Sequence, residues 1–393
     1  MTKAAAQRIA ERMARIEAFE VMEIQTLARE VEAHGHDVVH LEIGEPDFTT
    51  PRTIVEAAKR ALDTKPMFYT SALGLLELRE AIARFYRERY GVDVPASRIV
   101  VTAGSSAALL LALGVLTNPG DEVLLADPSY PCNRHFVHAL GGVPHLVPVG
   151  ADRGYQLDAA IARANWNDRV RIAMVATPSN PTGTLVSPQV VRELAALARE
   201  KGATLLVDEI YHGLTYGLDA RTALEAGDDI VVINSFSKYF QMTGWRLGWM
   251  VVPQALVRDV EKLAQNLFIS PSTVAQYAAL ACFAPGTIAV LEERRHELDA
   301  RRRFLLPGLQ ELGFRVPVEP HGAFYIYADC SSLSDDSFAF ARRVLTEAHV
   351  AMTPGKDFGH NHPERHIRIA YTQPIGRLGE ALERIRRFVR AGA

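Results

Sequence analysis

Short, almost continuously apolar segments alternate with amphipathic segments through the middle of the chain. The apolar segments are rich in Val, Ile and Leu, as strands covered on both faces must be. Helical periodicity fills most of the intervals, for example residues 187–201, which can serve as crossovers between parallel strands. The pattern predicts an α/β fold with a mainly parallel, seven-stranded sheet. The expected strands are residues 98–102, 122–126, 143–147, 172–176, 204–208, 230–234 and 248–252.

The pattern changes after about residue 285, where charged helical periodicity and isolated strands replace the regular alternation. The elements expected there are a helix at 291–312, strands at 324–328 and 367–370, and a closing helix at 375–390. They predict a smaller α+β domain, completed by the N-terminal segment. We therefore expect a large domain of residues 46–285 and a small domain of residues 1–45 plus 286–393, with no Gly/Ser or Pro linker between them.

Composition narrows the class of protein. With 48% hydrophobic and 23% charged residues, the 393-residue chain can build a large core. The net charge of −3 does not suggest a nucleic-acid or membrane partner. Cys132, Cys282 and Cys330 are widely spaced, which fits a reducing compartment and argues against a zinc site or a disulfide framework. Glutamates interleave the N-terminal arginines, so a surface helix is expected there instead of a transit peptide, and the protein is expected to be cytoplasmic.

Residues 99–117 carry no charge and are long enough to span a bilayer. However, Gly104-Ser105-Ser106 interrupts the segment early, and Asn118-Pro119-Gly120-Asp121 ends it with a turn. We expect a buried strand, a small-residue loop and a buried helix over 108–116 instead of a membrane span.

Lys238 is a candidate for chemistry as an amine. It follows Ser235 and Ser237, and Arg246 comes shortly after it. These side chains can donate several hydrogen bonds to a phosphate. An amine beside a phosphate site suggests a Schiff base to a phosphorylated aldehyde cofactor, the pyridoxal phosphate arrangement. Taken alone, a lysine flanked by serines is more often a solvated loop residue.

Asp208 ends an apolar run, where a carboxylate is costly without a cationic or strong hydrogen-bonding partner. A protonated pyridine nitrogen would be such a partner, whereas a helix N-cap or a structural ion pair is the alternative. Tyr211 and Asn180 could donate hydrogen bonds to a phenolate oxygen on the same ring. We hypothesise that the Asn180–Pro181 bond is cis, because a cis bond can hold an Asn side chain in a tight turn.

Two further positions suit an anionic ligand. Gly104, Ser105 and Ser106 precede the helix at 108–116, where free amides and the helix dipole favour a phosphate. Arg368 lies in an apolar strand and needs an anion, either a substrate carboxylate or a neighbouring Asp or Glu. Tyr130 follows a turn and could stack on a flat ring or simply pack. No dinucleotide-binding glycine motif and no P-loop is present.

In their order along the chain, these residues resemble a fold-type I, class I/II pyridoxal phosphate-dependent aminotransferase of the aspartate aminotransferase superfamily. Each match is modest, but their order and spacing together are highly specific. The matching segments are Ile43-Gly44-Glu45-Pro46-Asp47-Phe48, Tyr69 with Gly74, Gly104-Ser105-Ser106, Asn180-Pro181-Thr182-Gly183, Asp208-Glu209-Ile210-Tyr211, Ser235-Phe236-Ser237-Lys238, Arg246-Leu247-Gly248 and Arg368.

The resemblance implies a role for each matched residue. Lys238 would form the Schiff base at rest and move the proton during turnover, and Asp208 would pair with the pyridinium. Asn180 and Tyr211 would contact the ring hydroxyl, and Tyr130 would stack on the ring. The phosphate would be held by Gly104, Ser105, Ser106, Ser235, Ser237 and Arg246. The substrate carboxylate would be bound by Arg368, the backbone of Gly44 and Asn180.

In relatives, the tyrosine at the position of Tyr69 reaches the cofactor of the other subunit, so the resemblance implies a homodimer with shared sites. Some aspartate-specific relatives carry a lysine at the position of Ser106, and its absence here puts dicarboxylate specificity in doubt. Residues 19–24 resemble the segment that lines the substrate entrance in the family.

The expected reaction is a ping-pong transfer of an amino group between an L-amino acid and a 2-oxo acid. A carbon–sulfur lyase or an aminocyclopropane carboxylate synthase would use the same core residues, because both reactions begin with the same α-carbanion. A non-enzymatic, aminotransferase-like regulator would need an additional DNA-binding domain, which the early start of the fold and the acidic composition disfavour.

Overall fold

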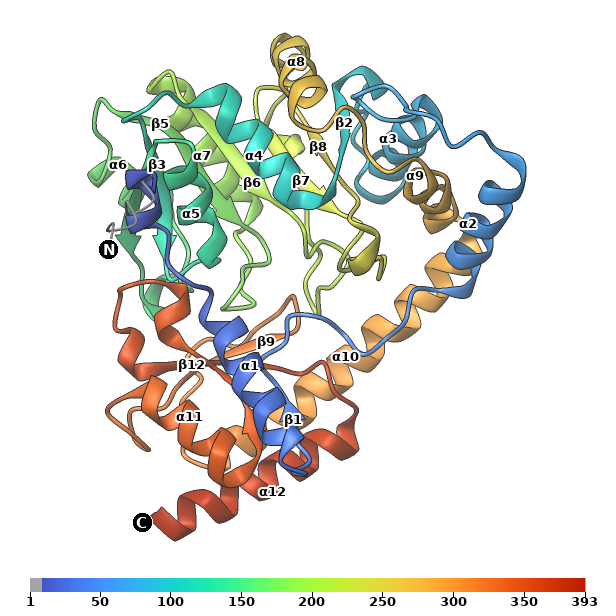
Figure 1. Ribbon diagram of the computed structural model, residues 1–393. Helices are drawn as coiled ribbons and strands as arrows, with labels where there is room; N and C mark the ends of the chain where they lie inside the picture. Colours follow the sequence, from blue (N-terminus) through green and yellow to red (C-terminus); the bar gives the residue numbers. More distant parts are fainter. Residues whose placement is uncertain (1–8, 393) are drawn as a thin grey trace, which may run out of the picture.

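The computed structural model describes residues 9–392 and contains a seven-stranded sheet in the order β2-β8-β7-β6-β5-β3-β4 (Figure 1). Only β8 runs antiparallel to its neighbours, so the predicted mainly parallel sheet is confirmed. Every predicted strand lies within two residues of its observed bounds. These bounds are β2 (Ile99–Thr102), β3 (Glu122–Asp127), β4 (Val143–Pro148), β5 (Val170–Ala176), β6 (Thr204–Asp208), β7 (Val231–Ser235) and β8 (Gly248–Val251).

Both faces of this sheet are covered, which explains why its strands are continuously apolar. Along β6, Leu205 and Val207 join the hydrophobic cluster that contains α7 (Pro188–Glu200), whereas Leu206 joins the cluster of α4 (Gly104–Leu116) and α8 (Val257–Leu267). Alternate side chains therefore serve opposite faces. The other helices of this part are α2 (Arg52–Thr64), α3 (Leu76–Tyr90), α5 (Pro131–Ala139), α6 (Ala159–Ala164) and α9 (Thr273–Ala279).

The smaller part combines both ends of the chain. β1 (Val39–His40) pairs in parallel with β10 (Val350–Ala351), and α1 (Glu20–Ala33) packs beside them. The predicted domain boundaries at residues 45 and 285 stay a prediction. The remaining elements are an antiparallel sheet of β11 (Thr353–Pro354), β12 (His366–Ala370) and β9 (Tyr325–Asp329), with α11 (Ser337–Ala348) and α12 (Ile375–Gly392).

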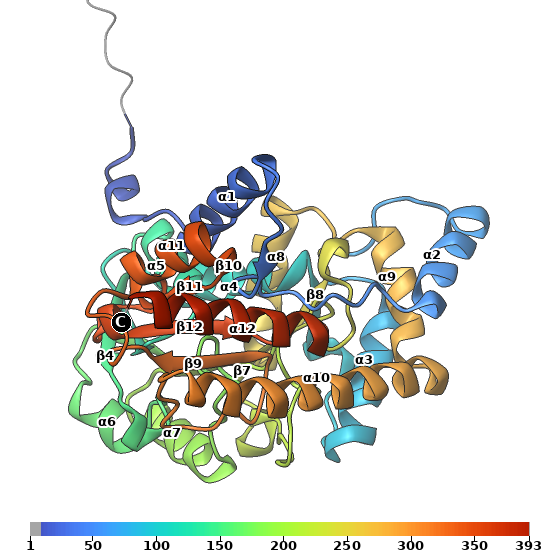
Figure 2. The same cartoon turned by 90° about the horizontal axis from the view of Figure 1, so that it is seen from below.

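One long helix, α10 (Pro285–Glu311), contacts both α2 and α12 and so connects the two parts (Figures 1 and 2). The sequence predicted its start at residue 291, but it begins at Pro285. Proline fits the first turn of a helix because its missing N–H has no helical partner there. The Pro-Gly pair therefore opens the helix, although such pairs also mark turns.

A second correction concerns residues 104–106, which were predicted to form a loop. They are the first turn of α4. Within residues 9–392, no single helix has both the length and the apolar composition of a membrane span; only the bent pair Thr273–Phe283 with Pro285–Glu311 reaches both when taken together.

Candidate active site

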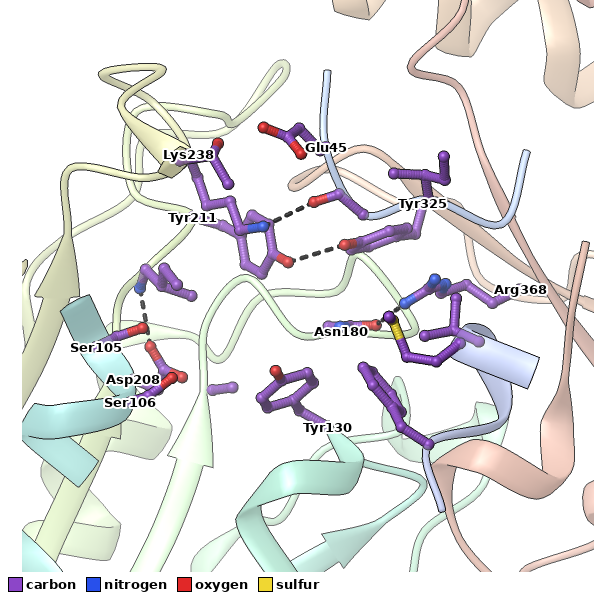
Figure 3. A pocket seen from close by; sticks show the side chains of 18 of the residues that line it. Glu45, Ser105, Ser106, Tyr130, Asn180, Asp208, Tyr211, Lys238, Tyr325 and Arg368 are labelled. Atoms are coloured by element: carbon purple, nitrogen blue, oxygen red, sulfur yellow. Dashed lines mark hydrogen bonds between the residues drawn. The ribbon is translucent and has the colours of Figure 1, made fainter. Parts of the chain in front are cut away.

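A cavity of about 340 Å³ lies between the carboxyl ends of β5 and β6 and the smaller part of the molecule (Figure 3). This is the edge at which parallel sheets bind ligands. The cavity brings together nine of the predicted site residues: Gly44, Ser105, Ser106, Tyr130, Asn180, Asp208, Tyr211, Lys238 and Arg368. The other predicted residues, Gly104, Tyr69, Ser235, Ser237 and Arg246, do not line it.

Lys238 projects into the cavity from the turn after β7, and its Nζ donates to the carbonyl oxygen of Gly44 at 2.7 Å. Burial lowers the pKa of Lys238 to about 8, although the nearby carboxylate of Glu45 acts in the opposite direction. A depressed pKa increases the fraction of neutral amine near neutral pH. The side chain is therefore suited to act as a nucleophile and as a proton acceptor.

Asp208 is the last residue of β6 and is only 5% exposed. Its Oδ1 accepts a hydrogen bond from the backbone N–H of Ile210 at 3.0 Å, and burial raises its pKa to about 6. Within the described part of the chain it has no salt-bridge partner. A buried carboxylate of this kind is stabilised by a cationic group placed in the cavity.

The start of α4 forms the anion-binding end of the site. Ser105 and Ser106 line the cavity there, and Arg246 approaches the same turn. A Cβ at Gly104 would lie 2.6 Å from Nη2 of Arg246, so only glycine allows the guanidinium this close. Backbone amides, helix dipole and guanidinium together suit a phosphate.

Ser235 and Ser237 are buried in the turn that carries Lys238. The Oγ of Ser235 donates to the carbonyl of Leu247 at 3.3 Å and accepts from the N–H of Ser237 at 3.0 Å. These bonds shape the turn, and the predicted phosphate contacts of both serines stay a prediction.

Arg368 lies on β12, at the end of the cavity opposite to Ser105 and the start of α4, and is 2% exposed. Its guanidinium donates to Oδ1 of Asn180 at 3.1 Å, and its carbon lies 4.4 Å from the ring centroid of Tyr325. It also donates to the carbonyl of Glu42 at 2.5 Å. No carboxylate of the described residues forms a salt bridge with it, although the charge of Arg368 acts to lower the pKa of nearby Asp357. The alternative of a direct salt bridge to a neighbouring Asp or Glu is therefore wrong, and the buried guanidinium can bind an anionic ligand.

The Asn180–Pro181 bond is cis, as hypothesised. Tyr211 is buried, which raises the pKa of its phenol well above the usual range, and its hydroxyl lies 3.0 Å from that of Tyr325 (Figure 3). Asn180 and Tyr211 thus reach the cavity between Lys238 and Arg368. They place polar groups where a ring oxygen could bind.

Tyr325 is the main site residue that the sequence did not reveal. It stands in a predicted strand of continuous apolar character, which gives no signal for a ligand contact. The predicted entrance segment does reach the cavity through Phe19, Val21 and Met22. The ring of Phe19 stands edge-on to Tyr130, with centroids 6.3 Å apart.

Tyr69 lies outside the cavity, with its side chain 81% exposed. It borders a surface groove with Leu62, Met67 and Phe68, opposite residues 270–274. Within one chain the tyrosine does not reach the cavity, and its predicted contact with the cofactor of a partner subunit stays a prediction.

Fold and cavity together define a PLP fold type I enzyme. Residues 36–385 match the sequence profile of the family "Aminotransferase class I and II", and the chain belongs to this family. It is an enzyme, an aminotransferase, and its family is PLP-dependent. The matches lend no support to the lyase, synthase or regulator alternatives.

Two relatives illustrate the similarity in sequence. A (5-formylfuran-3-yl)methyl phosphate transaminase of Methanocaldococcus jannaschii is 37% identical, over 97% of this chain and 99% of its own. A valine–pyruvate aminotransferase of Mycobacterium tuberculosis is 38% identical, over 93% of this chain and 95% of its own.

Solved structures agree in fold. An aminotransferase from Mycobacterium tuberculosis superimposes with a TM-score of 0.95 at 37% identity, covering 98% of this chain and all of the other. The structure of the aspartate aminotransferase from Thermus thermophilus with maleate superimposes with a TM-score of 0.92 at 33% identity. The match covers 97% of this chain and 99% of the other.

Proposed function

We propose that this aminotransferase binds pyridoxal phosphate in the cavity and moves an amino group between an L-amino acid and a 2-oxo acid by a ping-pong mechanism. One observation carries the proposal. The amine of Lys238 and the buried carboxylate of Asp208 share a cavity with Arg368, a buried cation that forms no salt bridge among the described residues.

The residues present fit the cofactor. Asp208 is a buried carboxylate in need of a cation, which the protonated ring nitrogen would supply. The start of α4, with Arg246 set against Gly104, would hold the phosphate. Tyr130 would stack on the ring. Asn180 and Tyr211 would contact its hydroxyl. When bound, pyridoxal phosphate supplies an electron sink for negative charge at the substrate α-carbon.

Side chains of the protein itself have two further roles, substrate binding and proton transfer. Arg368 binds the α-carboxylate and orients the substrate, with Asn180 and the backbone of Gly44 beside it. Lys238 would hold the cofactor through its Nζ. As a free amine, the same Nζ would accept the proton of the substrate α-carbon, a role that its lowered pKa favours. The same residues act in reverse on the second substrate.

Reduction of the purified holoenzyme with borohydride tests the cofactor assignment. The expected result is a stable pyridoxyl adduct on the peptide that contains Lys238, found by mass spectrometry. An adduct on another lysine, or none, would refute the assignment. In a parallel assay, ammonia and pyruvate released without an added 2-oxo acid would indicate a lyase instead of an aminotransferase.

We also propose a homodimer with shared sites. Large apolar side chains, among them Leu62, Phe68 and Tyr69, are exposed around one groove, and a protein surface of this kind marks an interface. Tyr69 would reach the cofactor phosphate of the partner subunit. Sedimentation should then give twice the chain mass of 43.3 kDa.

Hybrid dimers test whether the sites are shared. Lys238→Ala and Tyr69→Ala remove groups that would meet in one site, so a mixed dimer carries both defects in one site and keeps the other intact. Mixing the two inactive variants under limiting cofactor should therefore restore activity. If each site were built by one chain, no mixed dimer would contain an intact site and activity would not return.

The compartment is proposed to be the cytoplasm, because Cys132, Cys282 and Cys330 are all free thiols. Fractionation of the source cells with an antibody against the chain would test this, and recovery outside the cytoplasmic fraction would contradict it.

A further inference from the structure

One wall of the cavity is apolar and is formed largely by the N-terminal segment. Phe19, Val21 and Met22 line the cavity here, at the start of α1, and Leu109 of α4 and Ile43 are further apolar residues of the cavity lining. Met22 keeps 52% of its surface exposed although it borders a cavity. Apolar surface of this kind is stabilised when an apolar group covers it.

Four charged side chains line the described part of the cavity, and two of them serve the cofactor in the proposed function. The ionised side chains that line it are Glu45, Asp208, Lys238 and Arg368. Lys238 and Asp208 serve the cofactor in the proposed function. Arg368 is the only other cation among the described lining residues, and one carboxylate of the substrate occupies it. Gln25, the one polar side chain that α1 contributes, is uncharged.

Glu45 adds a repulsive element near the reacting amine. It is exposed, forms no hydrogen bond or salt bridge with its side chain within the described residues, and lies close enough to raise the pKa of Lys238. A second carboxylate on the substrate would meet this negative charge and an apolar wall, with no further cation among the described lining residues to offset its desolvation. An apolar side chain would instead gain roughly fourfold in affinity for each buried methylene.

We infer that the amino-acid substrate of this enzyme carries an uncharged, apolar side chain, aliphatic or aromatic, and that the α1 wall selects it against amino dicarboxylates. The inference rests on the proposed function, because it assumes that Arg368 takes the α-carboxylate. Met22, which lines the cavity and is 52% exposed, is the residue of this wall that we expect to determine specificity for the substrate side chain.

Unreactive substrate analogues test the inference without relying on turnover. The holoenzyme is titrated with 4-methylpentanoate and 3-phenylpropanoate, and separately with succinate and glutarate. Dissociation constants are taken from the visible absorbance of the bound cofactor and from calorimetry. The monocarboxylates are expected to bind at least about tenfold more tightly, the effect of burying two or more methylenes. Dicarboxylates that bind equally well or better, for instance through a cation from a second subunit, would overturn the inference.

Single-turnover rates extend the test to real substrates. L-Leucine, L-methionine and L-phenylalanine should convert the bound cofactor at least about tenfold more efficiently than L-aspartate. Preference for L-aspartate would contradict the inference.

Variants of α1 locate the selecting wall. Met22→Lys places a cation on it and should shift the ratio of the two dissociation constants toward the dicarboxylates by about tenfold or more. Met22→Leu keeps size and polarity and should preserve the ratio. Glu23→Gln is the matched control, since it raises the net charge equally at an exposed position of the same helix that does not line the cavity. An unchanged ratio in Met22→Lys would refute the role of this wall.

The outcomes separate the two proposals. If borohydride attaches no cofactor to Lys238, the proposed function fails and the inference fails with it. If the cofactor is attached but dicarboxylates are preferred, the proposed function stands and only the inferred specificity is wrong.

Discussion

The two ends of the cavity are built in different ways. Asp208 ends β6 and Lys238 lies just after β7, and these two strands are neighbours in one sheet, joined by a single connection of the chain. Arg368 is instead held by Asn180 and by the carbonyl of Glu42, which lies 326 residues away in the sequence. The cofactor end is thus local to one sheet, whereas the substrate end exists only when three distant segments meet.

The substrate end also has an ionic support, formed by Glu42, His40 and Glu32. Glu42 is fully buried, and its Oε1 lies 2.8 Å from Nδ1 of His40. The other ring nitrogen of His40 lies 3.1 Å from Glu32 on α1. Glu42, with support from His40, therefore connects the backbone that holds Arg368 to the helix that forms the apolar wall.

The largest effect is expected from a substitution at the cofactor end of the cavity. Lys238→Ala removes both the covalent anchor and the proton acceptor, so turnover should fall by at least about 10²–10⁴-fold. Steady-state kinetics and the loss of the borohydride adduct check this. Lys262→Ala, an exposed lysine of α8, serves as the control and should retain full activity. Turnover that survives in Lys238→Ala would remove this lysine from the mechanism.

Asp208→Asn should have the next largest effect. It removes the charge expected to pair with the cofactor, and loss of one partner of a buried pair costs about 3–5 kcal/mol, which corresponds to roughly 150- to 5,000-fold. Both cofactor affinity and kcat should fall, as measured by equilibrium dialysis and kinetics. Asp229→Asn breaks a partly exposed pair with Arg199 and should leave both parameters near wild type. If Asp208→Asn retains both the cofactor affinity and the kcat of the wild type, the carboxylate of Asp208 has only a structural role.

Arg368→Gln weakens the substrate end alone. A charged hydrogen-bonding pair contributes about 1.5–3 kcal/mol, so KM for both substrates should rise about 10–10²-fold while cofactor affinity stays unchanged. Arg365→Gln, a variant of a partly exposed arginine paired with Asp329, is the control. A fall in cofactor affinity in Arg368→Gln would show that the two ends are not separable.

The smallest effect concerns the ionic support. Hydrogen bonding and attraction to Glu42 raise the pKa of His40 to about 9, against an ordinary value of 6.5. Because the folded pKa is raised, this stabilisation is fully present below pH 6.5 and is lost as the pH rises through 9. His40→Gln should therefore lower the free energy of unfolding by about 1.5–3 kcal/mol at pH 6, and by less at pH 9.5.

Urea denaturation of wild type and variant at both pH values checks this prediction. His34→Gln changes an exposed histidine at the end of α1 and should show little dependence of this kind. A deficit in His40→Gln that is the same at both pH values would mean that packing, and not charge, accounts for the role of His40.

Much of the fold was predictable because its signals are local. Strands buried on both faces must be apolar throughout, so all seven strands of the large sheet could be placed within two residues. The errors came from Gly, Ser and Pro, which open α4 and α10 here although the same residues also form turns. Tyr325 was missed because nothing near it in sequence distinguishes a cavity residue from a core residue.

The sequence alone determined the chemistry at the strand ends, because Asp208 and Lys238 stand at set distances from strands that the apolar pattern already locates. Only the tertiary structure decided what surrounds Arg368 and which side chains face the substrate. Those contacts join β12, the segment after β1 and the start of α1, and no local pattern encodes a meeting between segments hundreds of residues apart. The reaction class could therefore be predicted from the chain, whereas the inferred choice of an apolar substrate follows from how its two ends pack together.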